Sequence, residues 1–233
     1  RQGSSRKKAD VVVVTQDVFP YSFLLTPNND NDALFGVSNV NIAGLGHELE
    51  YDYIRGGGSD FFYRVPNVYG TFIDSELNYA HHFRRTGFGA FLNREFYTQE
   101  TKYAGGAAYS NYKYGEFDYE PVSDVTSPYF YEKKYANLWL GRAFKTKIKT
   151  HLLGINAETN AVASIGVEHA DFFDRPIVTA DTNYRYHDKT TYLVSLGLSA
   201  RNYYKDRFIE QFGRTEDIPT GSEIGVTTGY QST

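Results

Sequence analysis

Histidine and arginine gather in the segment His81-His82-Phe83-Arg84-Arg85, and these side chains could bind a metal ion or a phosphate group. If the segment is extended, the two imidazoles point to opposite faces and cannot easily chelate one ion. Arginine suits bidentate contact with phosphate, so a phosphate contact by Arg84 or Arg85 is one interpretation. The interpretation that we favour is an ordinary strand end.

Hydrolytic chemistry would need a nucleophile, a base and a carboxylate. The candidate histidines are His47, His151, His169 and His187, and the candidate serines are Ser110, Ser164, Ser195 and Ser199. The chain has no Gly-x-Ser-x-Gly elbow and no cysteine. The glycines at 56–58 precede neither a Lys-Ser/Thr pair nor a helix, so they indicate a turn and not a phosphate loop. We therefore expect no catalytic, cofactor-binding or metal-binding residue and no cofactor.

The elements that carry these residues alternate in polarity. From Glu48 to Ile54, acidic residues alternate with apolar or aromatic ones. Successive side chains of a β-strand point to opposite faces, so this segment predicts a strand with one apolar and one acidic face. The same pattern returns from Thr71 to Ala80 and from Tyr192 to Arg201. We expect nine to eleven such strands in one antiparallel all-β fold.

Composition indicates where such a sheet would lie. Aromatic residues make up 17% of the 233 residues, with 21 tyrosines, although the mean hydropathy is only −0.50. Tyrosine suits a surface that meets both lipid and water. The longest aliphatic run, Val11 to Val14, is far shorter than the ~20 residues of a membrane helix. The formal net charge of −4 offers no basic surface for nucleic acid. The sequence therefore predicts an antiparallel transmembrane β-barrel of a Gram-negative bacterial outer membrane, in which the histidines and arginines of residues 81–85 lie near lipid headgroups.

The alternation assigns residues to two sides of that barrel wall. The residues expected to face lipid are Leu49, Tyr51, Tyr53, Ile73, Leu77, Tyr79, Tyr192, Val194, Leu196 and Leu198. The residues expected to face the lumen are Glu48, Glu50, Asp52, Asp74, Glu76 and Asn78.

Arg94 interrupts one apolar face. The pattern places it on the same side as Phe88 and Phe96. An unpaired arginine at mid-bilayer costs about 2–4 kcal/mol. Arg94 therefore either lies near the membrane interface or is turned inward by a bulge, where it would pair with Glu95 or another acid.

The chain divides into three parts. Residues 1–8 form a basic leader that we expect to be disordered, and residues 9–20 form a strand of a preceding domain or a linker. Residues 21–233 supply barrel strands, with one or two helical turns expected at Lys205–Phe212 and a turn at Ile218–Gly221. The chain starts without a signal peptide and stops after a strand without a terminal aromatic residue. We therefore expect it to be an incomplete portion of a larger barrel.

Three segments resemble a known family. They are NVNIAGLGHEL at 39–49, NREFYTQETKYAGG at 93–106 and FGRTEDIPTG at 212–221. The chain resembles the bacterial surface antigen superfamily of BamA-like and TamA-like barrels, in particular members from the Bacteroidetes. The residues that carry the family-like motif are Gly44, Gly46, Arg94, Gly213, Arg214 and Glu216. The Arg-Gly-Phe loop of the family is absent, since Arg55-Gly56 is followed by Gly57.

The resemblance implies a function and a set of partners. It implies a barrel of about sixteen strands that follows a periplasmic POTRA-like domain, whose last strand would be Ala9–Asp17. Such a protein assists insertion or translocation of other proteins at the outer membrane, and it is not an enzyme. Its first and last strands would part, and client strands would pair with the exposed edge near residues 33–54. The implied partners are outer-membrane lipid and lipopolysaccharide, client outer-membrane proteins and accessory lipoproteins, without nucleic acid.

Two other functions fit the same pattern. A passive outer-membrane pore or structural barrel would conduct ions without affecting the assembly of other barrels. A soluble ligand-binding β-barrel or β-sandwich would be extracted from cells without detergent.

Overall fold

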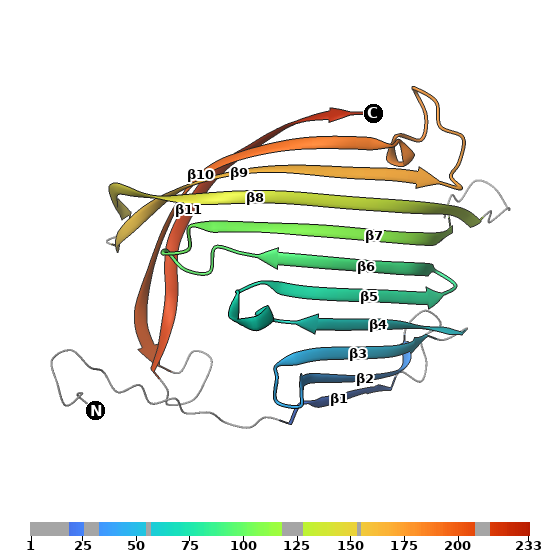
Figure 1. Cartoon of the computed structure of the whole chain (residues 1–233), viewed down its shortest axis with the longest axis horizontal. Coiled ribbons are helices and arrows are strands. Elements are labelled where there is room, and N and C mark those ends of the chain that lie inside the picture. The colour runs from blue at the N-terminus through green and yellow to red at the C-terminus, as the bar shows by residue number, and fades with distance from the viewer. Residues whose placement is uncertain (1–18, 26–32, 55–56, 118–127, 153–154, 208–214) are drawn as a thin grey trace.

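One antiparallel sheet makes up almost all of the part of the chain that the structure describes. The structure is a computed structural model, and it describes residues 19–25, 33–54, 57–117, 128–152, 155–207 and 215–233. Eleven strands follow one another in the sheet in the order of the sequence, each paired with the next (Figure 1). The prediction of an antiparallel all-β fold is thereby confirmed. The predictions for residues 1–8 and for Ala9–Asp17 concern residues that lie outside the described part of the chain.

The strands differ greatly in length. They are β1 (Tyr21–Leu25), β2 (Ala33–Ile42), β3 (His47–Ile54), β4 (Gly58–Val65), β5 (Asp74–His82), β6 (Arg85–Arg94), β7 (Tyr103–Phe117), β8 (Pro128–Leu152), β9 (Ile155–Phe173), β10 (Lys189–Arg207) and β11 (Thr215–Ser232). Two short 3₁₀ turns, η1 (Val68–Gly70) and η2 (Tyr184–Tyr186), interrupt the connections. None of the helices in the described part of the chain is long and apolar enough to cross a membrane.

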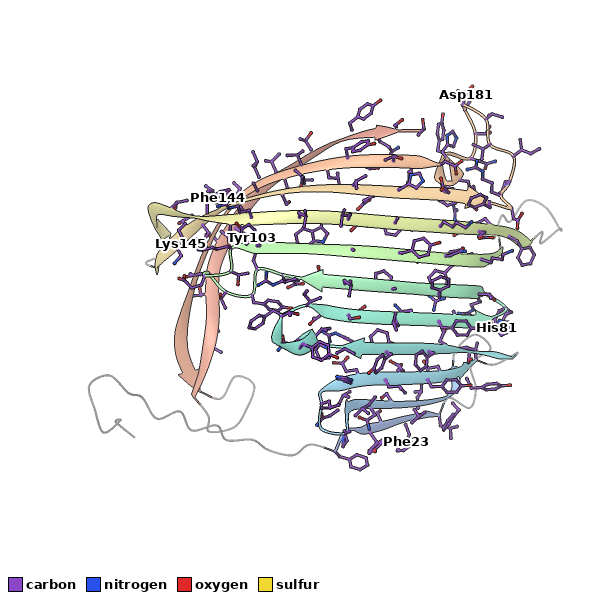
Figure 2. All side chains as sticks on the ribbon, viewed as in Figure 1. Phe23, His81, Tyr103, Phe144, Lys145 and Asp181 are labelled. Carbon is purple, nitrogen blue, oxygen red and sulfur yellow. The ribbon has the colours of Figure 1, made fainter. Side chains whose placement is uncertain are left out.

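The connections gather at two opposite ends of the sheet. One end carries Asp181, in the β9–β10 loop, and His81, beside the β5–β6 turn (Figure 2). The other end carries Lys145 and Phe144 of β8 beside Tyr103, the first residue of β7. We call them the Asp181 end and the Lys145 end.

The sheet is open in the described residues. β1 pairs only with β2, and β11 pairs only with β10, so neither edge has a second neighbour. The hairpin of β10 and β11 sweeps around the Lys145 end and away from the flatter array of β4 to β8 (Figure 1). Closure into a barrel is therefore not part of the described fold.

The β2–β3 turn follows the predicted glycine pattern. Gly44 and Gly46 have φ angles of 76° and 70°, which glycine adopts without a steric penalty. The side-chain oxygen of Asn41 accepts the backbone N–H of Gly46 at 2.7 Å and closes the turn.

Two local predictions near the end of the chain are wrong. Lys205 was expected to begin a helical turn, but β10 continues through Arg207 and pairs there with Thr215. The remainder of that segment, 208–212, lies outside the described residues. The turn expected at Ile218–Gly221 is instead part of β11, where Pro219 lies opposite Tyr203. Proline is tolerated there because β11 is an edge strand, so a missing N–H need not break the ladder.

Arg94 and Phe96 separate at the end of β6. Arg94 is the last residue of β6, and its guanidinium donates to the carbonyl oxygen of Tyr103 at 3.0 Å. No register shift occurs between β6 and its neighbours, so no bulge turns Arg94 inward. The chain leaves the strand after Arg94, and the Phe96 ring packs over Gly141 of β8. The prediction that Phe96 shares a face with Phe88 is therefore wrong.

Little of the chain is buried, because the sheet is a single layer. The buried core cluster comprises Ala170, Phe172 and Tyr186, with Tyr131 and Tyr135 packed against it. It forms where the β9–β10 loop folds back on the sheet.

Gly87 offers a test of the register in the middle of this sheet. Its φ is 150°, and a Cβ there would collide with the carbonyl oxygen of Asn111 on β7. We expect Gly87→Ala to lower the free energy of unfolding by about 2–4 kcal/mol in urea titrations followed by circular dichroism. Gly225→Ala is the matched control, because its nearest neighbour would lie at an ordinary 3.4 Å. An equal loss for both variants would contradict the β6–β7 register.

Candidate functional site

The register divides the side chains between two chemically different faces. Residues directly opposite one another on antiparallel strands lie on the same face. Tyr51 lies opposite Val37 and Phe61, whereas Glu48 lies opposite Arg64. The face of Tyr51 collects aromatic and aliphatic residues from β1 to β11, and we call it the apolar face. The face of Glu48 carries charged residues, serine and glycine together with some aromatic residues such as Phe62 and Trp139, and we call it the polar face.

The sequence-based assignments sort cleanly onto these faces. The residues predicted to face lipid lie on the apolar face except Ile73, which precedes β5; they are Leu49, Tyr51, Tyr53, Leu77, Tyr79, Tyr192, Val194, Leu196 and Leu198. The residues predicted to face the lumen share the polar face; they are Glu48, Glu50, Asp52, Asp74, Glu76 and Asn78. Which medium covers each face stays a prediction.

No protein layer covers the apolar face in the described residues. Leu196 and Val226, which lie opposite each other on β10 and β11, are 63% and 71% exposed. Burying a side chain of this size stabilises a protein by about 1.5–3 kcal/mol. Apolar patches on soluble monomers rarely exceed about 300–600 Å². An exposed apolar face that extends over eleven strands is therefore expected to be covered by another molecule or by lipid.

The apolar band crosses the strands diagonally. Tyr79 of β5 lies opposite Phe88 of β6, but the same row continues into Asn111 on β7 and Lys134 on β8. On β9 and β10 the band is displaced toward the Lys145 end, where Ile165 lies opposite Val194. The strands are therefore inclined to the direction in which the band runs.

Arg64 organises the charges on the N-terminal half of the polar face. Its guanidinium donates to Asp74 at 2.8 Å and to Glu48 at 3.2 Å, and it lies 3.8 Å from a carboxylate oxygen of Glu76. These groups come from β3, β4 and β5. One guanidinium thus ties three neighbouring strands together, which is the fork geometry that distinguishes arginine from lysine.

A second cluster lies nearer the Asp181 end of the same face. Asp60 lies 3.3 Å from Nε2 of His82 and 3.2 Å from the Arg85 guanidinium. Arg85 also sits over the ring of Tyr112 at 5.2 Å. His82 and Arg85 are thus held by protein groups, which weakens the interpretation of this segment as a phosphate site.

The β9–β10 loop forms a fixed cap on the polar face. Arg175 makes two parallel hydrogen bonds to Asp188, at 2.7 and 2.9 Å, and also donates to the carbonyl oxygen of Tyr186. Burial pushes the pKa of Asp188 up, but the backbone N–H of Phe172 and the Arg175 guanidinium outweigh it and hold that pKa below its usual range. The Tyr186 ring packs edge-on against Phe172. The loop is therefore anchored by an ion pair and an aromatic cluster.

The candidate histidines whose side chains are described, His47, His169 and His187, contact groups other than the candidate serines. His47 contacts the Tyr63 hydroxyl at 2.8 Å, and His187 contacts backbone carbonyl groups of its own loop. His169 links Thr190 at 2.8 Å to Asp171 at 3.0 Å, a hydroxyl–imidazole–carboxylate series. The neighbouring N–H groups belong to the β9–β10 ladder, so they do not form an oxyanion hole. The side chain of His151 lies outside the described residues.

The candidate serines lie apart from these histidines. Ser110, Ser164, Ser195 and Ser199 are all on the polar face, whereas His169 is on the apolar face. Ser195 shares a hydrogen bond with Thr227 at 2.8 Å. Within the described segments, no group of three or more histidine, aspartate or glutamate side chains is placed to hold a metal ion.

The family-like motif residues do not meet in one place. Gly44 and Gly46 lie in the β2–β3 turn, whereas Arg94 ends β6. Gly213 and Arg214 lie outside the described residues. Of Glu216 the structure describes only the backbone, which pairs with Asp206 on β10.

Sequence reasoning missed Arg64, Asp60 and the part played by His82. A signal was present, because the acids of Glu48–Asp52 required a counter-charge and Arg64 stands among aromatic residues on the next expected strand. Only the register brings them together.

Comparison of the chain with protein-family models, curated proteins and solved structures finds no match. The sheet and its two faces therefore carry the functional argument by themselves.

Removing the Arg64 guanidinium tests the charge network. In Arg64→Met, three carboxylates lose their shared partner, and we expect the free energy of unfolding to fall by about 1–3 kcal/mol. The expected loss of stability is modest because the Arg64 side chain is 32% exposed, so solvent partly screens its ionic contacts. Arg84→Met is the control, since Arg84 has no carboxylate partner among the described residues, and it should change stability by less than about 0.5 kcal/mol. If urea titrations gave the same loss of unfolding free energy for both variants, the Arg64 contacts would not be important for stability.

Proposed function

We propose that this chain forms part of the wall of an outer-membrane β-barrel, with the apolar face against lipid and the polar face toward the lumen. The observation that carries the proposal is the bare apolar face that continues over all eleven strands, backed by a face of charges, serine and glycine. A bilayer is a phase that covers such a face while the sheet satisfies its own backbone hydrogen bonds.

Two further observations support this orientation. The diagonal apolar band is what a membrane-parallel belt looks like on strands that tilt by about 35–45° to the membrane normal. The sheet also curls toward its polar face at the Lys145 end, because Glu95 after β6 and Glu223 of β11 line one pocket although four strands separate them. A polar concave side and an apolar convex side fit a water-filled lumen within lipid.

The further function that we propose is assistance to the insertion or translocation of other proteins, as in BamA-like barrels. It needs no cofactor and no covalent chemistry. The support from the structure is the N-terminal edge: β1 has five residues and, within the described residues, pairs along one side only. Such an edge can accept a client strand by β-augmentation. The partners would be outer-membrane lipid, lipopolysaccharide, client barrels and accessory lipoproteins.

A pair of neighbouring residues tests the membrane orientation. Leu196 is on the apolar face and Ser195 is on the polar face of β10. With the chain folded into phosphatidylcholine vesicles, we expect Leu196→Arg to lose about 2–4 kcal/mol of stability in urea titrations. Ser195→Arg, whose side chain would enter the lumen, should lose less than about 1 kcal/mol. The opposite order would invert the proposed faces, and equal small effects would argue against a bilayer.

The client function needs a separate test in cells that make the protein. A photo-activated cross-linker at Phe23 of β1 should capture nascent outer-membrane proteins, because this position lies on the free edge strand. Leu140 of β8 is the control, since it is similarly exposed on the apolar face but lies inside the sheet. Depletion should slow assembly of other barrels. Ion conductance without client cross-links or an assembly defect would instead establish a passive pore.

A further inference from the structure

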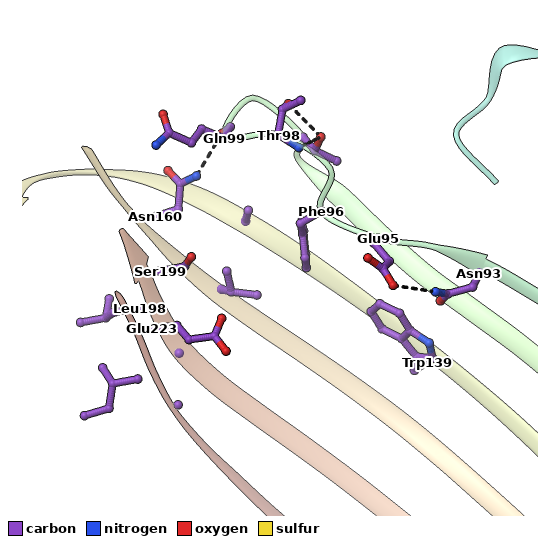
Figure 3. A pocket seen from close by; sticks show the side chains of 16 residues that line it. Asn93, Glu95, Phe96, Thr98, Gln99, Trp139, Asn160, Leu198, Ser199 and Glu223 are labelled. Carbon is purple, nitrogen blue, oxygen red and sulfur yellow. Dashed lines mark hydrogen bonds between the residues drawn. The ribbon is translucent and has the colours of Figure 1, made fainter. Parts of the chain in front are cut away.

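A pocket of about 600 Å³ lies on the polar face near the Lys145 end. The β6–β7 loop, residues 95–102, forms one side, and β8 to β11 form the floor and the other side. Figure 3 shows Glu95, Asn93 and Trp139 together on one side and Glu223 and Ser199 on the ribbons opposite. The pocket belongs to neither charge cluster described above.

The only tryptophan of the chain, Trp139, lines this pocket, and neighbouring glycines leave space for its side chain. A Cβ on Gly106 would lie 2.5 Å from the indole nitrogen of Trp139, and one on Gly166 would lie 3.2 Å from the Trp139 Cβ. A Cβ on Gly141 would meet both Trp139 and Phe96, at 3.3 and 3.1 Å. The sheet therefore leaves space for two aromatic side chains beside each other.

The loop that closes the pocket is fastened to the sheet. The backbone N–H of Ala143 donates to the carbonyl oxygen of Lys102 at 2.9 Å. The Asn160 side chain donates to the carbonyl oxygen of Gln99 at 3.0 Å (Figure 3). The Lys145 ammonium pairs with Glu100 outside the pocket. These links come from β8 and β9, so the pocket has a preformed wall.

The charge of the lining is one-sided. Among the described side chains it includes the carboxylates of Glu95 and Glu223 but no lysine, arginine or histidine. Within the described chain, neither carboxylate lies within ion-pair distance of a cationic side chain; Glu95 accepts only a long bond, 3.4 Å, from the Asn93 amide. Both other charge clusters of the polar face, by contrast, contain their own arginine.

We propose that this pocket binds an organic cation, an ammonium or guanidinium group attached to an apolar body. The carboxylates of Glu95 and Glu223 supply opposite charge, and the faces of Trp139 and Phe96 supply cation–π and apolar contact. The amides of Asn93 and Asn160 add hydrogen-bond acceptors at its edge. The site goes beyond the client function, and it is independent of what covers the apolar face.

Fluorescence of Trp139 gives a direct measurement, because no other tryptophan contributes. The full chain in a nonionic detergent is titrated with choline and, separately, with the peptide acetyl-Gly-Arg-Gly-amide. We expect a saturable change in emission with at least one of these probes. Binding of choline alone indicates a small free cation, and tighter binding of the peptide indicates an arginine-bearing segment. Their neutral analogues, 3,3-dimethylbutanol and the citrulline peptide, should bind at least about 10-fold more weakly.

Variants locate the site. Glu95→Gln and Glu223→Gln should each raise Kd about 3- to 10-fold, and together they should abolish saturation. Glu50→Gln is the control, because Glu50 is a carboxylate on the same face that lies outside this pocket. The proposal is overturned if neither charged probe binds at millimolar concentration, if the neutral analogues bind equally well, or if the two pocket variants bind like the unaltered chain. None of these results bears on the Leu196 and Ser195 comparison.

Discussion

The two-residue period of an extended chain is the constraint on which this structure depends. Each strand must give all of its odd positions to one face and all of its even positions to the other. Antiparallel pairing then forces neighbouring strands to agree, since a slip of one residue would exchange the faces of a whole strand. The described residues form one sheet without a second layer, so its two faces cannot cover each other. The surroundings must therefore supply what a packed core supplies in other folds.

A strand could be predicted from the sequence where its own residues alternate between polar and apolar. Glu48–Ile54 shows it in its own sequence, and the register places its two sets of residues as the alternation predicts. β8 shows this alternation only in part. The predicted strand Ala136–Phe144 lies within a strand of 25 residues, and the residues that follow Phe144 are mainly lysine and threonine. Such an extension is stabilised by the adjacent ladder of β9 and not by its own pattern. The same reason explains why Lys205 and Pro219 are extended.

The site was harder to predict because its partners come from different strands. Arg64 and Glu48 are sixteen residues apart, and only the pairing of β3 with β4 sets them side by side. The pocket depends on more still, namely on the departure of the chain from β6 after Arg94 and on the curl that brings β11 toward the β6–β7 loop. Curvature is a property of the whole sheet, so no single segment encodes it.

The polar face also joins two regions whose strands are held together by different side-chain contacts. Around Arg64, ionic contacts brace β3, β4 and β5 against sliding past one another. Around β10 and β11, Gly197 lies directly opposite Gly225, and the next pairs on this face are Ser195 with Thr227 and Ser199 with Glu223. Among the described side chains no ion pair joins these two strands, and glycine in a strand permits bending. The ionic contacts resist distortion of β3, β4 and β5, whereas the glycines permit bending of β10 and β11. A force applied to the free edge of the sheet would therefore bend β10 and β11 first.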